Sequence, residues 1–133
     1  MAGLYVDTSA LGRVLLAEPD AAVIIDVIER YETAWSSELL EVELRRVAFR
    51  EGIENGVEEL LADVSLVALD AEGLRRAAAI PPSEVRTLDA IHLQAAVELH
   101  KEGTIEAALT FDHQLHAGCT HHDLRLAAIS QPG

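Results

Sequence analysis

Three aspartates stand at points where an apolar run ends and a helix-like run begins. They are Asp7 in LYVDTSAL, Asp89 in RTLDAIHL and Asp112 in ALTFDHQL. In α/β proteins, ligands bind at the edge of the sheet formed by the carboxyl ends of the strands. Carboxylates that meet there offer the oxygen ligands that hard divalent cations prefer. The spacing therefore predicts a metal site to which these three side chains contribute.

A fourth acid, Glu43, lies on the side of its helix that should turn towards the core. The segment 39–50 has helical spacing, and at about 100° per residue Glu43 falls within its apolar stripe. Helix capping cannot explain this position, and an unpaired carboxylate on an apolar face is costly. A buried ion pair with Arg46 or Arg50 is one explanation. A cation shared with the aspartates explains the position more fully.

Each aspartate also has an ordinary structural explanation. Asp7 and Asp112 precede helix starts, where a carboxylate accepts hydrogen bonds from exposed N–H groups. Asp89 follows Thr87, a good capping residue, and would then be a first-turn acid favoured by the helix dipole. For any one aspartate this explanation is as good as a metal site. It explains the sequence less well when three aspartates at such junctions and Glu43 on an apolar face have to be explained together.

Four converging carboxylates suit the hydrolysis of phosphodiester bonds. A bound Mg²⁺ or Mn²⁺ lowers the pKa of a water molecule, orients it in line with the phosphorus and stabilises the developing charge. No nucleophilic side chain is required. A carboxylate can act as the base towards that water, and the sequence does not assign which one.

Length and composition predict one globular domain in a reducing compartment. The chain has 133 residues, half of them hydrophobic, which is enough to bury a core. No apolar run approaches the roughly 20 residues that a membrane span needs. Cys119 is the only cysteine, so an internal disulfide is excluded. We therefore expect a cytoplasmic protein with no membrane segment.

The net charge limits the ways in which the chain can bind nucleic acid. Asp and Glu number 23 against 10 Lys and Arg, a formal charge of −13. Bulk electrostatic binding of duplexes normally relies on a basic surface, so we do not expect it here. Arg46, Arg50 and Arg86 lie near the acids in sequence or helical phase and are candidates for contacting phosphates. Ion pairing with the surplus acids is the alternative for each arginine.

Strands alternate with helices along the chain, which predicts a parallel sheet covered by helices on both faces. We expect strands at Gly3–Val6, Thr33–Ser36, Ser65–Leu69, Ala107–Phe111 and Leu126–Ile129. Helical stripes lie at 11–15, 24–28, 39–50, 57–64, 71–79 and 88–99, and a short helix follows Asp112 and ends near Gly118.

Three other phosphate chemistries do not match the sequence. A haloacid dehalogenase-type phosphatase needs a second aspartate two residues after Asp7, where Ser9 stands. A receiver domain needs a lysine late in the sheet, and Lys101 lies in a helical segment. No Gly-rich run ends in Gly-Lys, so a nucleotide-binding P-loop is absent.

The stretch 113–122 is rich in His and Cys, the natural ligands of zinc. Its spacing matches no usual zinc motif, so loop residues near the rim of the site are the preferred interpretation. We predict that His92, three residues after Asp89, belongs to helix packing.

The order of LYVDTSAL, SSELLEVELRR, VRTLDAIHLQAA and LTFDHQL resembles the PIN-domain ribonucleases, and within them the VapC-type toxins of bacterial toxin–antitoxin modules. The resemblance spans nearly the whole chain and implies a single domain over 1–133. It implies a three-layer α/β/α sandwich with a parallel sheet of about five strands. It also implies that Asp7, Glu43, Asp89 and Asp112 form an acidic quartet that holds one or two Mg²⁺ or Mn²⁺ ions.

The same resemblance distinguishes between neighbouring residues. The family glutamate lies six residues after a serine at the end of the second strand, which gives Glu43 when counted from Ser37. Thr8 and Ser9 match the small polar residues after the first aspartate, which hold the carboxylate or a metal-bound water, and Thr110 is placed to do the same beside Asp112. Helix capping is the alternative for these hydroxyls.

The function that the resemblance implies is a metal-dependent endoribonuclease acting as the toxin of such a module. Its expected partners are an RNA substrate and a VapB-like antitoxin, within a homodimer or a toxin–antitoxin hetero-oligomer. The charge of −13 favours a basic partner. The alternatives are a catalytically silent interaction module of the same fold and a housekeeping PIN nuclease. RNA cleavage that is lost on Asp7→Asn would separate an enzyme from the silent module.

Overall fold

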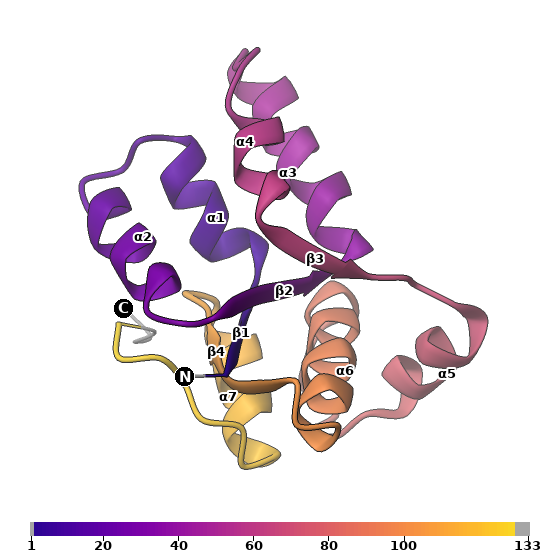
Figure 1. Cartoon of the computed structure of the whole chain (residues 1–133). Coiled ribbons are helices and arrows are strands. Elements are labelled where there is room, and N and C mark those ends of the chain that lie inside the picture. Colours follow the sequence, from indigo (N-terminus) through magenta and orange to yellow (C-terminus); the bar gives the residue numbers. More distant parts are fainter. Residues whose placement is uncertain (1, 130–133) are drawn as a thin grey trace.

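All four strands of the central sheet run parallel in the computed structural model, which describes residues 2–129 (Figure 1). They are β1 (Gly3–Val6), β2 (Thr33–Ser37), β3 (Val64–Val67) and β4 (Ile105–Leu109), in the order β3-β2-β1-β4. The predicted parallel sheet with helices on both faces is confirmed. Because β1 lies between β2 and β4, the carboxyl ends of these three strands meet at one edge.

The fifth strand that we expected at Leu126–Ile129 is wrong. Only one bridge forms there, between Leu126 and Ala108. The N–H of Ala108 donates to the carbonyl oxygen of Arg125, and the carbonyl oxygen of Ala108 accepts from the N–H of Ala127. The chain then turns. The apolar pattern thus reflects burial against β4 and not a paired strand.

Seven helices connect and cover the strands within residues 2–129. They are α1 (Thr8–Leu15), α2 (Ala21–Glu29), α3 (Glu38–Glu51), α4 (Val57–Ala62), α5 (Ala71–Ala79), α6 (Thr87–Lys101) and α7 (His113–His121). None of these helices has the length and apolarity needed to cross a membrane.

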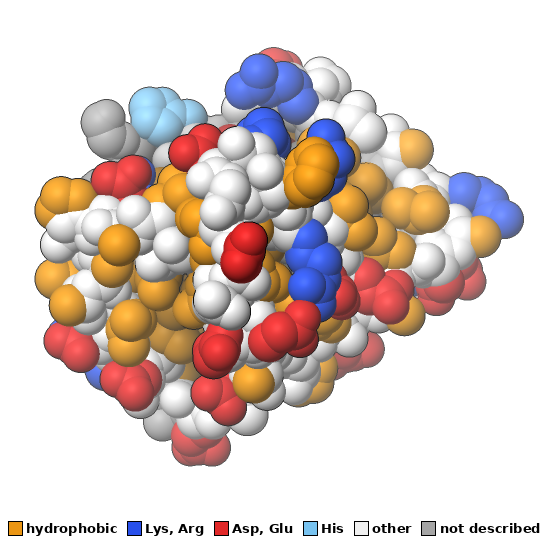
Figure 2. All heavy atoms as spheres, turned by 90° about the horizontal axis from the view of Figure 1, so that it is seen from above, with side chains coloured by type: hydrophobic (Ala, Val, Ile, Leu, Met, Phe, Trp, Pro, Cys, Tyr) orange, Lys and Arg blue, Asp and Glu red, His pale blue; other side chains and the backbone are white. Residues whose placement is uncertain are grey.

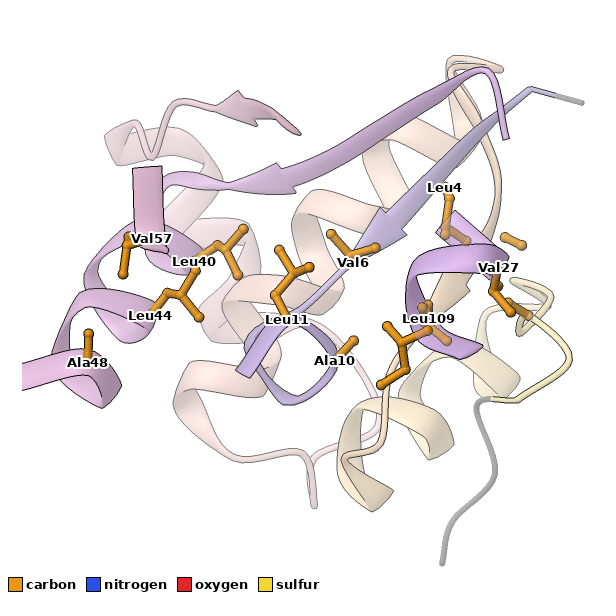
Figure 3. Close-up of a cluster of buried hydrophobic side chains, with 13 residues drawn as sticks. Leu4, Val6, Ala10, Leu11, Val27, Leu40, Leu44, Ala48, Val57 and Leu109 are labelled. Carbon is orange, nitrogen blue, oxygen red and sulfur yellow. The ribbon is translucent and has the colours of Figure 1, made fainter. Parts of the chain in front are cut away.

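Alternating side chains of the strands divide the core into two clusters. Leu4 and Val6 of β1 point to the face covered by α1, α2, α3 and α4, where they pack with Leu11, Leu40 and other buried side chains (Figure 3). Tyr5 points to the opposite face, covered by α6 and α7, and packs near Leu93. The molecule is therefore a three-layer sandwich, with α5 lying beside α6 at one end (Figure 1).

The capping explanation of two aspartates is confirmed. Asp7 accepts a hydrogen bond from the N–H of Ala10 at the start of α1, and Asp112 caps the start of α7. The expected cap at Thr87 is wrong, because α6 begins at that residue and its N-cap, Arg86, makes no side-chain capping bond. Asp89 lies in the first turn of α6, as expected. Asp7 and Asp112 therefore cap helices and also lie at the edge of the sheet.

Candidate active site

The four acids come together at the carboxyl edge of the sheet. Asp7 follows β1, Asp112 begins the helix after β4, Glu43 lies in α3, which starts where β2 ends, and Asp89 lies in α6. The Asp89 and Asp112 carboxyls share a hydrogen bond, and the charge of Asp7 also acts on Asp89. Glu43, Asp89 and Asp112 line one open cavity of about 710 Å³.

Asp7 is buried and held by hydroxyl groups on both of its oxygens. Its Oδ1 accepts from Ser9 Oγ at 2.7 Å, and its Oδ2 accepts from Thr110 Oγ1 at 2.5 Å. Burial raises the pKa of Asp7 above its usual range, against the nearby His92 and the hydroxyl donors, which lower it. Ser9 also accepts from the N–H of Phe111 at 2.7 Å, which ties the start of α1 to the end of β4.

The protein partners of Glu43 are Thr8 and His92. Its Oε1 accepts from Thr8 Oγ1 at 2.6 Å and lies 2.8 Å from His92 Nε2. Within residues 2–129 neither Arg46 nor Arg50 pairs with it, so the alternative explanation by a buried ion pair with these arginines is wrong. Burial acts to raise the pKa of Glu43, but the hydrogen bonds from His92 and Thr8 outweigh it, and the pKa is lowered.

His92 is the residue that the sequence interpretation missed. It is only 3% exposed and packs in the core, as expected of a helix-packing residue, but both of its ring nitrogens also have polar partners. The available signal was helical phase, because positions three apart share a helix face and His92 follows Asp89 by three. This phase places His92 on the same side of α6 as Asp89.

Negative charge gathers at Asp89 and Asp112 without a basic partner. Asp112 Oδ1 accepts from the N–H groups of Gln114 and Leu115, at 2.8 and 3.0 Å. Burial, followed by the charges of Asp112 and Asp7, raises the pKa of Asp89 to about 6. In the described part of the chain no Lys or Arg pairs with either carboxyl. Such mutual repulsion is what a bound cation would relieve.

The donor chemistry of these acids fits a hard divalent cation. Across residues 2–129, no three His, Cys, Asp or Glu side chains are already grouped around a common ion position. Asp89 and Asp112 share a hydrogen bond, and hydroxyl groups hold Asp7. Both protein donors to Glu43 use Oε1, which leaves Oε2 for a cation. A cation between the carboxylates would take the place of the shared proton.

The stretch 113–122 shows no sign of a zinc site. It forms α7 and not a loop, and the Cys119 side chain is fully buried, with the pKa of its thiol raised to about 12 by burial. His122 Nε2 lies 2.6 Å from the carbonyl oxygen of Pro81, and its ring packs against His121. In the described residues these side chains do not form a group of three metal ligands.

The three candidate arginines lie on the walls of two cavities that meet at Glu43 and Leu88. Arg86 lines the cavity that contains Asp89 and Asp112. Arg46 and Arg50 line a second cavity of about 490 Å³, together with Thr8 and Glu43. None of the three forms an ion pair within residues 2–129, so their charges remain available. Figure 2 shows basic and exposed hydrophobic side chains lying together on the face seen from above, with acidic side chains around them.

The raised pKa of Asp89 predicts a pH-dependent cost to the stability of the metal-free protein. Its folded pKa of about 6 lies above the usual 3.8, so the group favours folding below pH 3.8 and loses that contribution as the pH rises through 6. Solvent screening at this half-buried carboxyl reduces the cost at pH 7.5 to about 1 kcal/mol. We expect Asp89→Asn, in EDTA, to raise Tm by about 3–5 °C at pH 7.5 and by nothing near pH 4. Thermal unfolding monitored by circular dichroism at both pH values checks this, and an equal gain at both would contradict it.

Comparison with known proteins shows which family the chain belongs to. Residues 4–118 match the model of the PIN domain. The chain is 37% identical to ribonuclease VapC47 of Mycobacterium tuberculosis over 123 residues, covering 87% of this chain and 89% of that protein. It is 33% identical to ribonuclease VapC35 of the same species, covering 96% and 98%. The crystal structure of M. tuberculosis VapC20, described as a Sarcin-Ricin loop cleaving toxin, superposes with a TM-score of 0.67 at 17% identity, covering 86% of this chain and 93% of that one.

Proposed function

Because the chain belongs to the PIN-domain family, and within it to the VapC-type ribonucleases of toxin–antitoxin modules, we propose that it cuts RNA at an acidic site that binds Mg²⁺ or Mn²⁺. The observation that carries the metal proposal is the gathering of Asp7, Glu43, Asp89 and Asp112, none of which pairs with a lysine or arginine within residues 2–129. The bound cation would activate a water molecule and stabilise the charge that develops on the phosphate.

The protein's own part in this reaction is to hold the carboxylates in place before substrate arrives. Ser9 and Thr110 fix Asp7, and Thr8 fixes one oxygen of Glu43. The backbone at the start of α7 fixes one oxygen of Asp112. Asp89 shares a hydrogen bond with Asp112, and a cation bound between the two carboxylates would replace that contact. Preorganised ligands of this kind lower the cost of reaching the transition state.

RNA contact is proposed to rest on local arginines, because the net charge of −13 opposes bulk attraction. Arg46 and Arg50 would contact phosphates on one side of Glu43 and Arg86 on the other. Phe49 is 77% exposed, and the Arg46 guanidinium lies 5.6 Å from its ring centroid. An unpaired base can stack on such a ring, which favours single-stranded RNA.

Removing two arginines together tests this contact. We expect an Arg46→Ala, Arg50→Ala double variant to raise KM for RNA by about tenfold or more at low salt and to leave kcat within about twofold, because phosphate contacts position the substrate. Steady-state kinetics on a short labelled RNA measures both constants. Arg75→Ala, which removes an exposed arginine of α5, is the matched control. A fall in kcat with KM unchanged would contradict the proposal.

A VapB-like antitoxin is the proposed protein partner, in a toxin–antitoxin hetero-oligomer or bound to a homodimer of this chain. The uncompensated acids would attract a basic segment of the antitoxin, which would then compete with the cation for Asp89 and Asp112. We propose that the activity is cytoplasmic, because that is where RNA substrates are found.

The test of the proposed function is RNA cleavage by the purified protein. Single-stranded and structured RNAs are incubated with protein and Mg²⁺ or Mn²⁺, and the products are separated by electrophoresis and mapped to a cleavage position. Protein carrying Asp7→Asn, purified in the same way, controls for contaminating nucleases. Defined products from the native protein alone would support the proposal. If no RNA in a broad set is cut, the silent interaction module becomes the better interpretation.

A further inference from the structure

Tyr5, His92 and Glu43 form a continuous chain of hydrogen bonds from the core to the site. The Tyr5 hydroxyl lies 2.7 Å from His92 Nδ1, and His92 Nε2 lies 2.8 Å from Glu43 Oε1. The two rings meet edge to face, at 5.8 Å between centroids and 80° between planes. Tyr5 is fully buried and His92 is nearly so, which leaves the imidazole no freedom to turn away.

The direction of these hydrogen bonds follows from the chemistry of the end groups. Burial raises the pKa of the Tyr5 phenol above its usual range, so the phenol keeps its proton and can donate to Nδ1. A neutral imidazole then carries its hydrogen on Nε2 and donates it to Glu43. A protonated imidazole has a hydrogen on both nitrogens and donates to Glu43 as well. In either form the carboxylate accepts from His92.

Both donors to Glu43 act on the same oxygen. His92 Nε2 and Thr8 Oγ1 lie 2.8 and 2.6 Å from Oε1, while Oε2 receives no hydrogen bond within residues 2–129. Two donors on one oxygen fix the carboxylate plane and leave the other oxygen for a cation. Outer contacts of this kind orient metal ligands in many sites.

We propose that His92 is a positioning residue, which holds Oε1 of Glu43 so that Oε2 is directed to the cation shared with Asp89 and Asp112. Tyr5 in turn holds the imidazole. The inference rests on the proposed metal-dependent function. The rival explanation is a buried histidine that only completes the core, which predicts lower stability without a specific effect on the metal.

The test measures Mn²⁺ binding by isothermal titration calorimetry to metal-free protein, together with kcat and KM for RNA. We expect His92→Leu to weaken Mn²⁺ binding by about 10–100-fold and to lower kcat at saturating RNA, with KM unchanged. His92→Gln keeps a side-chain N–H that can reach Glu43 and should recover part of the affinity. His100→Gln, on the same helix but away from the site, is the matched control and should bind as native protein does.

Two further measurements separate positioning from packing. Unfolding in EDTA reports the stability of each variant without metal, and affinities are compared only for variants that are folded at the assay temperature. Tyr5→Phe keeps the buried ring and removes only the hydroxyl, so it should weaken Mn²⁺ binding by a smaller factor in the same direction. Together with His92→Gln it decides the matter if His92→Leu does not fold.

The outcomes distinguish this inference from the function on which it rests. Folded His92→Leu or Tyr5→Phe with native Mn²⁺ affinity, in a native protein that binds Mn²⁺ and cuts RNA, would overturn the positioning role alone. Equal losses in His92→Gln and His92→Leu would also overturn it, because the donor would then make no difference. Native protein that neither binds Mn²⁺ nor cuts RNA would overturn the proposed function and this inference with it.

Discussion

Asp89→Asn is expected to lower kcat/KM for RNA cleavage by at least about 10³-fold, equivalent to about 4 kcal/mol of transition-state stabilisation. Burial, followed by the negative charges of Asp112 and Asp7, raises the pKa of Asp89 to about 6. An amide of the same shape presents one neutral oxygen in place of a carboxylate, so a cation would lose charge neutralisation as well as a ligand. Single-turnover cleavage of a labelled RNA measures the loss.

Stability makes this substitution easy to interpret. The same change removes like-charge repulsion and is expected to stabilise the metal-free fold at neutral pH, so lost activity would not reflect unfolding. Glu102→Gln, at the exposed far end of α6, removes the same unit of charge and should retain full activity. Cleavage by Asp89→Asn within tenfold of the native rate would show that this carboxylate takes no part in the chemistry.

Local sequence patterns predicted most of the helices and strands correctly, because these elements are short and regular. The strand at Gly3–Val6 and the helix at Ala71–Ala79 have the bounds that we expected. The apolar run at Leu126–Ile129 led to a wrong strand prediction, since burial against β4 produces the same pattern as a paired strand. The preference of threonine for the N-cap position also gave a wrong prediction at Thr87. The helix begins at Thr87 itself, one residue earlier than a cap at that residue would imply.

The candidate site could be predicted in its acids but not in its supporting contacts. Helical phase singled out Glu43 as an acid that needs a partner, and the structure brings it close to the aspartates. The identity of the partner depends on how α3 and α6 pack, and His92 is 49 residues away along the chain. No local pattern encodes that distance, so the only protein partners that the sequence offered for Glu43 were the arginines of α3 itself, and the structure does not pair them with it.

Removal of divalent metal is expected to abolish cleavage and to lower the stability of the native protein at neutral pH. Ligand present at about 100 times its Kd stabilises a fold by about 2.7 kcal/mol, and for a chain of this size that corresponds to a Tm increase of about 8–12 °C. Differential scanning fluorimetry with EDTA, Mg²⁺ or Mn²⁺, alongside the cleavage assay, measures both effects. Restoration of cleavage by Mn²⁺ after EDTA controls for irreversible damage.

The pH dependence of this metal effect follows from the same carboxyls. A cation binds the deprotonated form, and the pKa of Asp89 is about 6, so protons compete with metal below that value. We therefore expect the Tm increase caused by Mn²⁺ to be large at pH 7.5, to shrink as the pH falls through 6, and to be small at pH 7.5 in Asp89→Asn.

Calcium is a useful comparison because it also binds oxygen ligands but tolerates a larger and looser shell, so it can stabilise the fold without supporting cleavage. Cleavage that survives EDTA would overturn the metal-dependent mechanism, whereas a metal-dependent Tm without cleavage of any RNA would leave a cation site whose role is not catalytic.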